Sequence, residues 1–128
     1  MYDKELILSF LNNIDNSLHD IAEWMKDIQT VDDFLLTSHG TLVLNGVCMK
    51  ILAIGEELKS IDKRTNKQLL QKYNEVDWWK VMGMRDIIAH HYFEVDAEIV
   101  FNAATIYAPQ MADCIKQIIK DVEVSDDF

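Results

Sequence analysis

The sequence predicts an all-α protein, an antiparallel bundle of four to five helices, and three observations carry this prediction. Apolar residues recur at steps of three and four through most of the chain, as they do on amphipathic helices. No segment shows the alternation of polar and apolar residues that is typical of a strand. One proline and four glycines in 128 residues are too few for a turn-rich β protein or a disordered chain.

The first predicted helix runs from Leu6 to Ile28, about seven turns, with apolar residues on one face. Asp3 is expected to cap its start, because a carboxylate there can accept from the free N–H groups of the first turn. Residues 30–33, TVDD, interrupt the pattern, and residues 34–36 are expected to form a short helical turn.

A second helix is predicted from about Thr41 to Ile61. Its inner face is expected to comprise Leu44, Val47, Cys48, Ile51, Ile54, Gly55 and Leu58. Glycine inside a helix costs up to about 1 kcal/mol relative to alanine. We therefore interpret Gly46 and Gly55 as positions where another helix approaches closely. Residues 68–73 are expected to form a short helix.

Asp77 is the predicted N-cap of a third helix that ends between residues 91 and 94. Asp96 is the predicted N-cap of a fourth helix that reaches Val122. Pro109 lies inside this fourth helix, so a kink or a loosened turn is expected there. Residues 1–122 are thus predicted to form a single domain, and residues 123–128 an acidic, frayed tail.

Several classes of protein are excluded by what the sequence lacks. Cys48 and Cys114 are isolated and show no zinc-site spacing, which indicates core residues in a reducing compartment. The N-terminus lacks the basic and apolar regions of a signal peptide, and the apolar runs are shorter than the ~20 residues that cross a bilayer. We expect a cytoplasmic protein without a membrane partner. No nucleotide-binding loop or zinc-protease motif is present, so no cofactor or metal is expected.

The candidate site is a polar cluster in the third helix, residues 85–92, with the sequence RDIIAHHY. Arg85 and Tyr92 are seven residues apart and are expected on one stripe of the helix. Asp86 and His90 are four apart, so Asp86 is expected to accept a proton from the imidazole and orient it. Arg85 and His90 are five apart, about 140° around a regular helix. Either the helix end unwinds, or the site forms where two copies meet about a two-fold axis.

These residue types suit cleavage of an RNA phosphodiester. Histidine can take the proton of a 2′-hydroxyl or protonate the leaving oxygen. Arginine offers a fork of donors to phosphate, and tyrosine can bind phosphate or stack on a base. A structural interpretation stays open, because arginine and histidine are common near helix C-termini, where they complement the dipole.

The stretch 78–93, WWKVMGMRDIIAHHYF, resembles the signature of the HepT-like branch of the HEPN superfamily. That signature is Arg-x4-His-x-Tyr after a tryptophan and a Gly-Met pair, and Arg85, His90 and Tyr92 match it. Residues 54–58, IGEEL, resemble the Ile-Gly-Glu segment of the family, and the segment around Pro109 is similar as well. The resemblance extends from about Leu6 to Ile119.

The resemblance implies a helical homodimer whose two motifs line a cleft at the interface. Active members of the family are metal-independent endoribonucleases that act as toxins, and their RNA substrates can be tRNA. The implied partner is a minimal nucleotidyltransferase antitoxin of the MntA type, which can transfer AMP to the motif tyrosine, here Tyr92. By the same resemblance, Arg85 binds phosphate and His90 is the acid and base.

The sequence leaves three points open. Many family members have asparagine where this chain has Asp86, and the aspartate either weakens phosphate binding at Arg85 or orients His90. Glu56 is either a partner of Arg85 across helices or a solvated helix charge. The alternatives to a toxin are a non-catalytic module, which docks a nucleotidyltransferase and holds a nucleotide or other ligand, and a purely structural bundle.

The net charge of −10 disfavours indiscriminate binding to nucleic acid. The charges are unevenly distributed, because residues 50–85 hold eight basic and five acidic residues, a local net charge of +3. This basic segment leads into the candidate helix. The sequence therefore predicts a local positive cleft on an acidic body, with weak binding that disappears when Arg85 is removed.

Overall fold

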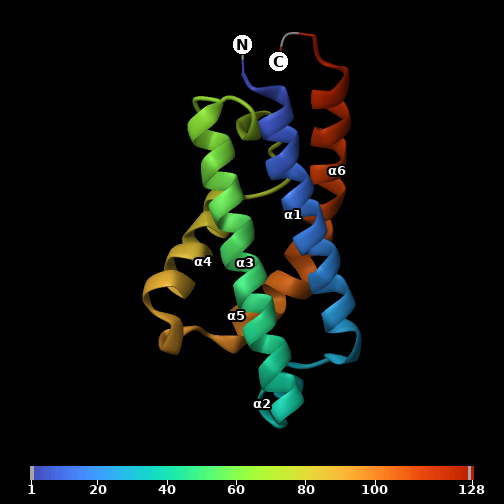
Figure 1. Ribbon diagram of the computed structural model, residues 1–128. Coiled ribbons are helices and arrows are strands. Elements are labelled where there is room, and N and C mark those ends of the chain that lie inside the picture. Colours follow the sequence, from blue (N-terminus) through green and yellow to red (C-terminus); the bar gives the residue numbers. More distant parts are fainter. Residues whose placement is uncertain (1, 127) are drawn as a thin grey trace.

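The protein is built of helices in the computed structural model, which describes residues 2–126 and 128 (Figure 1). Their bounds are α1 Lys4–Trp24, α2 Val31–Leu35, α3 Ser38–Arg64, α4 Trp78–His90, α5 Ala97–Asn102 and α6 Ala108–Val124. A π-helical turn, Ala103–Tyr107, joins α5 to α6, so these two elements form one continuous helical segment. No strand occurs in the described residues, and the predicted all-α class is confirmed.

Figure 1 shows α1, α3 and α6 side by side, with α4 on the outer flank of α3 and α5 crossing behind the lower half of α3. Helix α1 packs against both α3 and α6, whereas α4 packs chiefly against α3. The core lies between these helices. It contains Ile7, Leu11, Ile14, Leu18 and Ile21 of α1, Val47, Ile51, Ile54 and Leu58 of α3, and Met111, Ile115 and Ile118 of α6.

Helix α1 begins as predicted, because the Asp3 carboxylate accepts a hydrogen bond from the Leu6 N–H at 3.1 Å. It ends at Trp24 and tightens into a 3-10 turn, Met25–Asp27, so the predicted end at Ile28 is four residues too late for the α-helix. The predicted turn at 34–36 is the end of α2, with Leu36 as its C-cap. The helix already begins at Val31, inside the predicted interruption, and its start is capped by Thr30 and Asp33.

Helix α3 begins at Ser38, three residues before the predicted start. The Thr37 hydroxyl caps it by accepting from the Gly40 N–H at 2.8 Å. A Cβ at residue 40 would lie 1.8 Å from the Asp33 carbonyl oxygen, so only glycine fits where the chain turns back past α2. On the inner face, Val43 is buried and the predicted Leu44 is half-buried.

The loosened turn expected at Pro109 is confirmed. Pro109 lies in the first turn of α6, and the π-helical turn directly precedes that helix. Proline has no N–H for the carbonyl four residues earlier, and its ring crowds that carbonyl. The wider π turn removes this conflict without ending the helical segment.

The two ends of the chain lie close together (Figure 1). Lys4 Nζ donates to the carbonyl oxygens of Glu123 and Ser125, and α6 continues to Val124, two residues into the predicted tail. Met1 of the predicted domain and residue 127 of the predicted tail lie outside the described residues.

Cys48 and Cys114 are both free and buried, which confirms their interpretation as core residues. Burial raises the pKa of each thiol to about 11. Among the described residues, no helix combines the length and apolar character needed to span a bilayer.

Phe34 connects α2 to the rest of the core. It is fully buried and packs edge-to-face on Phe101 of α5, with ring centroids 6.1 Å apart. We expect Phe34→Ala to lower the free energy of unfolding by about 3–5 kcal/mol, because it leaves a cavity. Urea denaturation measures this change. Leu36→Ala, at a residue that is 76% exposed, is the control and should shift stability by less than about 0.5 kcal/mol.

Candidate active site

The N-terminal end of α4 is fixed by two hydrogen bonds. Asp77 caps the helix, as predicted, by accepting from the Lys80 N–H at 3.1 Å. Trp78 is buried, and its Nε1–H donates to the Tyr73 carbonyl oxygen at 2.9 Å. These contacts determine where α4 begins beside the C-terminal half of α3.

Gly55 lets α4 lie against α3 at the position of Arg85. A Cβ at residue 55 would lie 2.3 Å from the Arg85 Cβ and 2.8 Å from its Cγ, so no larger residue fits without moving one helix. The close approach expected at this glycine is confirmed. The stem of Arg85 consequently lies flat on α3, and its side chain is only 22% exposed.

Four charged side chains form a network across the two helices, which we call the charge network: Glu56 and Lys59 of α3, and Arg85 and Asp86 of α4. Arg85 Nε donates to Glu56 Oε1, and its Nη1 donates to Asp86 Oδ1 at 2.8 Å. Lys59 Nζ donates to the same Asp86 oxygen at 2.6 Å. Of the two roles left open for Glu56, the structure has the partner of Arg85 across helices, and the four charges sum to zero.

The charge network moves the pKa values of Asp86 and Arg85 in the directions that keep both groups charged. The Lys59 ammonium and then the Arg85 guanidinium hold the pKa of Asp86 below its usual value. Asp86 and Glu56 in turn raise the pKa of Arg85. The pairs are partly exposed, so they orient side chains more than they stabilise the fold.

Asp86 does not orient His90, contrary to the prediction. Its hydrogen bonds go to Lys59 and Arg85, and no hydrogen bond to His90 occurs within residues 2–126. The i, i+4 spacing places Asp86 and His90 near each other, but the carboxylate bonds the cations of Lys59 and Arg85, which are charge-assisted donors.

His90 is the last residue of α4, and its side chain is exposed. The helix stays regular through His90, so the five-residue spacing turns His90 about 140° away from Arg85. Of the two arrangements left open by the sequence, an unwound helix end is thus not what the structure has. Within one chain, Arg85 faces α3 and His90 faces outward.

Tyr92 lies beyond α4, in the 3-10 turn Tyr92–Glu94. The prediction that it shares a helical stripe with Arg85 is wrong, because the backbone leaves the helix at His91, with φ −137° and ψ 43°. Tyr92 is 41% exposed and packs edge-to-face on Phe93. Partial burial raises the pKa of its hydroxyl.

Lys59 is the site residue that sequence reasoning missed as a partner of Asp86. Its position three residues after Glu56 places both side chains on one face of α3. That spacing was a usable signal. The choice of Asp86 as its partner depends on the register of α3 against α4, which a helical pattern alone does not give.

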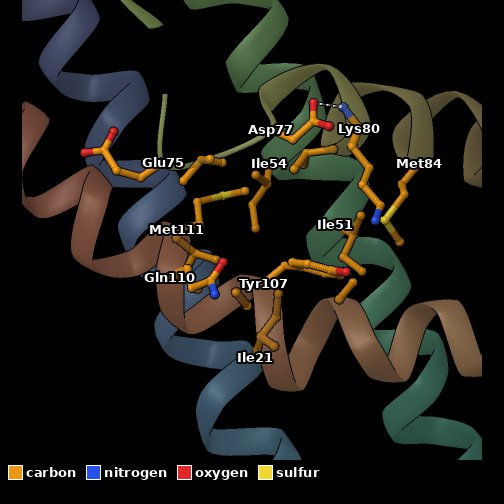
Figure 2. A pocket seen from close by; sticks show the side chains of 15 residues that line it. Ile21, Ile51, Ile54, Glu75, Asp77, Lys80, Met84, Tyr107, Gln110 and Met111 are labelled. Carbon is orange, nitrogen blue, oxygen red and sulfur yellow. Dashed lines mark hydrogen bonds between the residues drawn. The ribbon is translucent and has the colours of Figure 1, made fainter. Parts of the chain in front are cut away.

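A cavity of about 260 Å³ lies on the other side of α4 from the outward-facing His90, between α1, α3, α4 and α6. Figure 2 shows its wall of apolar side chains, including Ile51, Ile54 and Met111, with Lys80 and Tyr107 at one side. Lys80 Nζ lies 4.4 Å from the centroid of the Tyr107 ring. None of the four predicted site residues lines this cavity, so it is separate from the candidate site.

Among the described residues, no group of three His, Cys, Asp or Glu side chains is arranged to hold a metal ion. The site therefore consists of an arginine engaged by carboxylates, an exposed histidine and a half-exposed tyrosine.

The sequence model of the family described as "Ribonuclease HepT-like" matches residues 14–118, a span that contains the whole candidate site. The chain belongs to the HepT-like ribonuclease family. The family recognised from Arg85, His90 and Tyr92 is thereby confirmed.

Relatives of this HepT-like protein occur in Methanocaldococcus jannaschii. "Putative RNase MJ0127" is 29% identical over 124 residues, which cover 97% of this chain and 96% of the relative. "Putative RNase MJ0125" is 30% identical over 120 residues, 94% of this chain and 97% of the relative. "Putative RNase MJ1216" is 30% identical over 116 residues, 86% and 90% respectively. No solved structure shows a significant similarity to the chain.

The close contact at Gly55 gives a stability test. We expect Gly55→Ala to lower the free energy of unfolding by about 1–3 kcal/mol, because its Cβ forces α4 away from α3. Gly83→Ala on α4 is the matched control, since a Cβ there meets nothing within 4 Å. It should raise stability by about 0.5–1 kcal/mol. Urea unfolding of both variants measures the difference, and equal effects would contradict the close packing.

Proposed function

We propose that this HepT-like protein is a metal-independent endoribonuclease toxin that cleaves RNA with Arg85 and His90 and is neutralised by a minimal nucleotidyltransferase antitoxin. The observation that carries the proposal is membership of a ribonuclease family together with an intact Arg-x4-His-x-Tyr motif. The exposure of His90 and Tyr92 supports it, since both groups are accessible to a large substrate.

The chemistry is a transesterification within the RNA strand. His90 takes the proton from a 2′-hydroxyl, whose oxygen attacks the adjacent phosphorus, and the bond from phosphorus to the 5′-oxygen breaks. A protonated imidazole gives its proton to that leaving oxygen, so the products are a 2′,3′-cyclic phosphate and a 5′-hydroxyl. Arg85 stabilises the negative charge that builds up on the phosphoryl oxygens.

We infer that the working unit is a homodimer, because one regular α4 does not aim Arg85 and His90 at one phosphate. Exposed apolar side chains at the C-terminal end of α4 and beyond support this inference. They are Ile87, Tyr92, Phe93 and Ile99, and Phe93 is 99% exposed. A two-fold axis through this surface would bury these side chains and bring two motifs together.

The charge network limits how strongly Arg85 attracts RNA. Glu56 and Asp86 already accept hydrogen bonds from the guanidinium, and Lys59 is paired with Asp86. A phosphate therefore meets a neutral cluster and has to share Arg85 with two carboxylates. This arrangement favours a substrate that is held by additional contacts over any RNA that passes by.

The proposed catalysis gives a testable prediction. The purified chain should cleave RNA, including tRNA, in the presence of EDTA, and His90→Ala should lower the rate by about 10²–10⁴-fold. Arg85→Ala should lower it by about 10²–10³-fold. Gel analysis of end-labelled RNA measures cleavage and the terminal groups. His19→Ala, at an exposed histidine on α1, is the control and should cleave at the wild-type rate. Cleavage by His90→Ala at the wild-type rate would refute the proposed chemistry.

The proposed antitoxin gives another prediction. With ATP and a minimal nucleotidyltransferase, the Tyr92 hydroxyl attacks the α-phosphorus, pyrophosphate leaves and the phenolic proton is released to solvent. The added AMP places bulk and negative charge beside the site and should abolish cleavage. Intact-mass measurement should show AMP on the wild type and none on Tyr92→Phe. AMP on the Tyr92→Phe variant would assign the modification to another residue.

A second function, a non-catalytic module that docks a nucleotidyltransferase and holds a nucleotide, is favoured by one observation. Arg85 is engaged by two carboxylates of its own chain, an arrangement that suits a structural role as well as a catalytic one. This alternative predicts a tight complex with the nucleotidyltransferase and no RNA cleavage, so the cleavage assay separates the two.

A further inference from the structure

Two consecutive tryptophans begin α4, and their environments are opposite. Trp78 is buried at 6% exposure and hydrogen-bonded to Tyr73, which accounts for it as an anchor of the helix. Trp79 is 62% exposed, although burying its large apolar surface would stabilise the fold. Because Trp79 is exposed on the helix that carries the candidate site, we asked which molecule its ring could bind.

One face of the Trp79 ring is occupied and the side chain is otherwise open. Lys67 Nζ lies 5.2 Å from the ring centroid, within cation–π distance. Lys67 reaches this position because the chain turns sharply after α3, where Asn66 and Lys67 both have positive φ values of 52° and 61°. A left-handed lysine is uncommon, so this turn holds a cation over the ring at some cost in backbone energy.

Three lysines, Lys59, Lys63 and Lys67, lie at the end of α3 and in the turn that follows it. Lys59 of α3 contacts Asp86, and Lys67, in the turn after α3, contacts Trp79. Lys63 lies between these two lysines in the sequence and is exposed. Lys63 and Lys67 form no salt bridge with any of the described residues, so both ammonium groups are open to an anion.

Trp79 lies on the same stripe of α4 as His90. At 100° per residue, Trp79, Gly83 and His90 fall within about 40° of one another. The stripe is about 16 Å long, at a rise of 1.5 Å per residue. A Cβ at Gly83 would meet nothing within 4 Å, so the stripe is open at this residue. Asp86, seven residues after Trp79, also falls on this stripe, and its charge is paired with Lys59 and Arg85.

We propose that Trp79, Gly83, Lys63 and Lys67, together the Trp79 surface, bind single-stranded RNA next to the scissile phosphate. The proposal rests on the proposed function and names how the substrate is held. A base stacks on the open face of Trp79, and the phosphates follow Lys63 and Lys67 toward His90. Aromatic stacking beside a basic row is how proteins bind single strands without reading their sequence.

The charge distribution favours RNA as the occupant. The whole chain carries a net charge of −10, and the residues 50–85 that supply this surface carry +3. The charge network is neutral, whereas Lys63 and Lys67 of the Trp79 surface form no salt bridge with any of the described residues. A duplex keeps its bases stacked inside and offers none to Trp79, so the surface selects unpaired RNA.

The test is RNA binding by the full-length chain in the His90→Ala background, which keeps the strand intact. Anisotropy of a fluorescein-labelled single-stranded RNA should give a Kd that rises roughly 10-fold on adding Trp79→Ala. Trp79→Phe should restore most of the binding. Replacing Lys63 and Lys67 by glutamine should lower the slope of log K against log salt by about 0.7 for each phosphate that a lysine no longer neutralises.

Trp24→Ala is the matched control, because Trp24 is also an exposed tryptophan with a lysine over its ring, Lys50 at 5.4 Å, on another part of the molecule. It should leave the Kd unchanged, as should Trp79→Ala for duplex RNA. Thermal melts confirm that each variant is folded. Equal Kd values with and without Trp79→Ala, or an equally weakened Kd in Trp24→Ala, would overturn the proposal.

Cleavage by the chain with His90 intact separates this inference from the proposed function. A raised KM with little change in kcat in Trp79→Ala supports the Trp79 surface, and an unchanged KM overturns it while leaving the nuclease in place. Strand binding that depends on Trp79 without any cleavage overturns the nuclease and leaves the surface in place. Neither binding nor cleavage overturns both.

Discussion

The contact of Gly55 with the stem of Arg85 is the constraint on which the candidate site depends. Helix α4 packs chiefly against α3, and a cavity of about 260 Å³ separates it from α6. The position of α4 is therefore determined chiefly by its packing against α3. Because the missing side chain of Gly55 lets the two backbones approach, Arg85 lies on α3 and the outward stripe with His90 points away from the core.

The charge network determines the orientation of the Arg85 side chain more than it stabilises the fold. Each of its ion pairs is partly exposed, and such pairs contribute little to the free energy of folding. Their geometry is nevertheless specific, since Glu56 and Asp86 accept from different nitrogens of one guanidinium. The energy that holds α4 comes from burying Trp78, Met82 and Ile88. The network then selects one orientation of Arg85 among those that packing allows.

The parts of the fold that follow from local chemistry could be predicted from the sequence. Asp3, Asp77 and Asp96 cap helices as expected, because an N-cap needs only its own first turn. The start of α3 and the end of α4 were misplaced. A glycine such as Gly40 usually indicates the end of a helix, but here it lies in the first turn of α3, where contact with the Asp33 backbone requires it. The motif has a helical pattern through Tyr92, although the backbone leaves the helix at His91.

The partner of Asp86 could not be predicted for a related reason, since it depends on the register of two helices. The same register bears on how an acidic protein holds RNA in the proposed function. Glu56 and Asp86 offset the charges of Arg85 and Lys59, so the motif by itself adds no net attraction. Affinity must then come from neighbouring groups with spare charge or an open ring face. The basic turn that follows α3 supplies the charge, and Trp79 of α4 supplies the ring. Such a site discriminates by the strand it can stack, because long-range attraction from a body of charge −10 is absent.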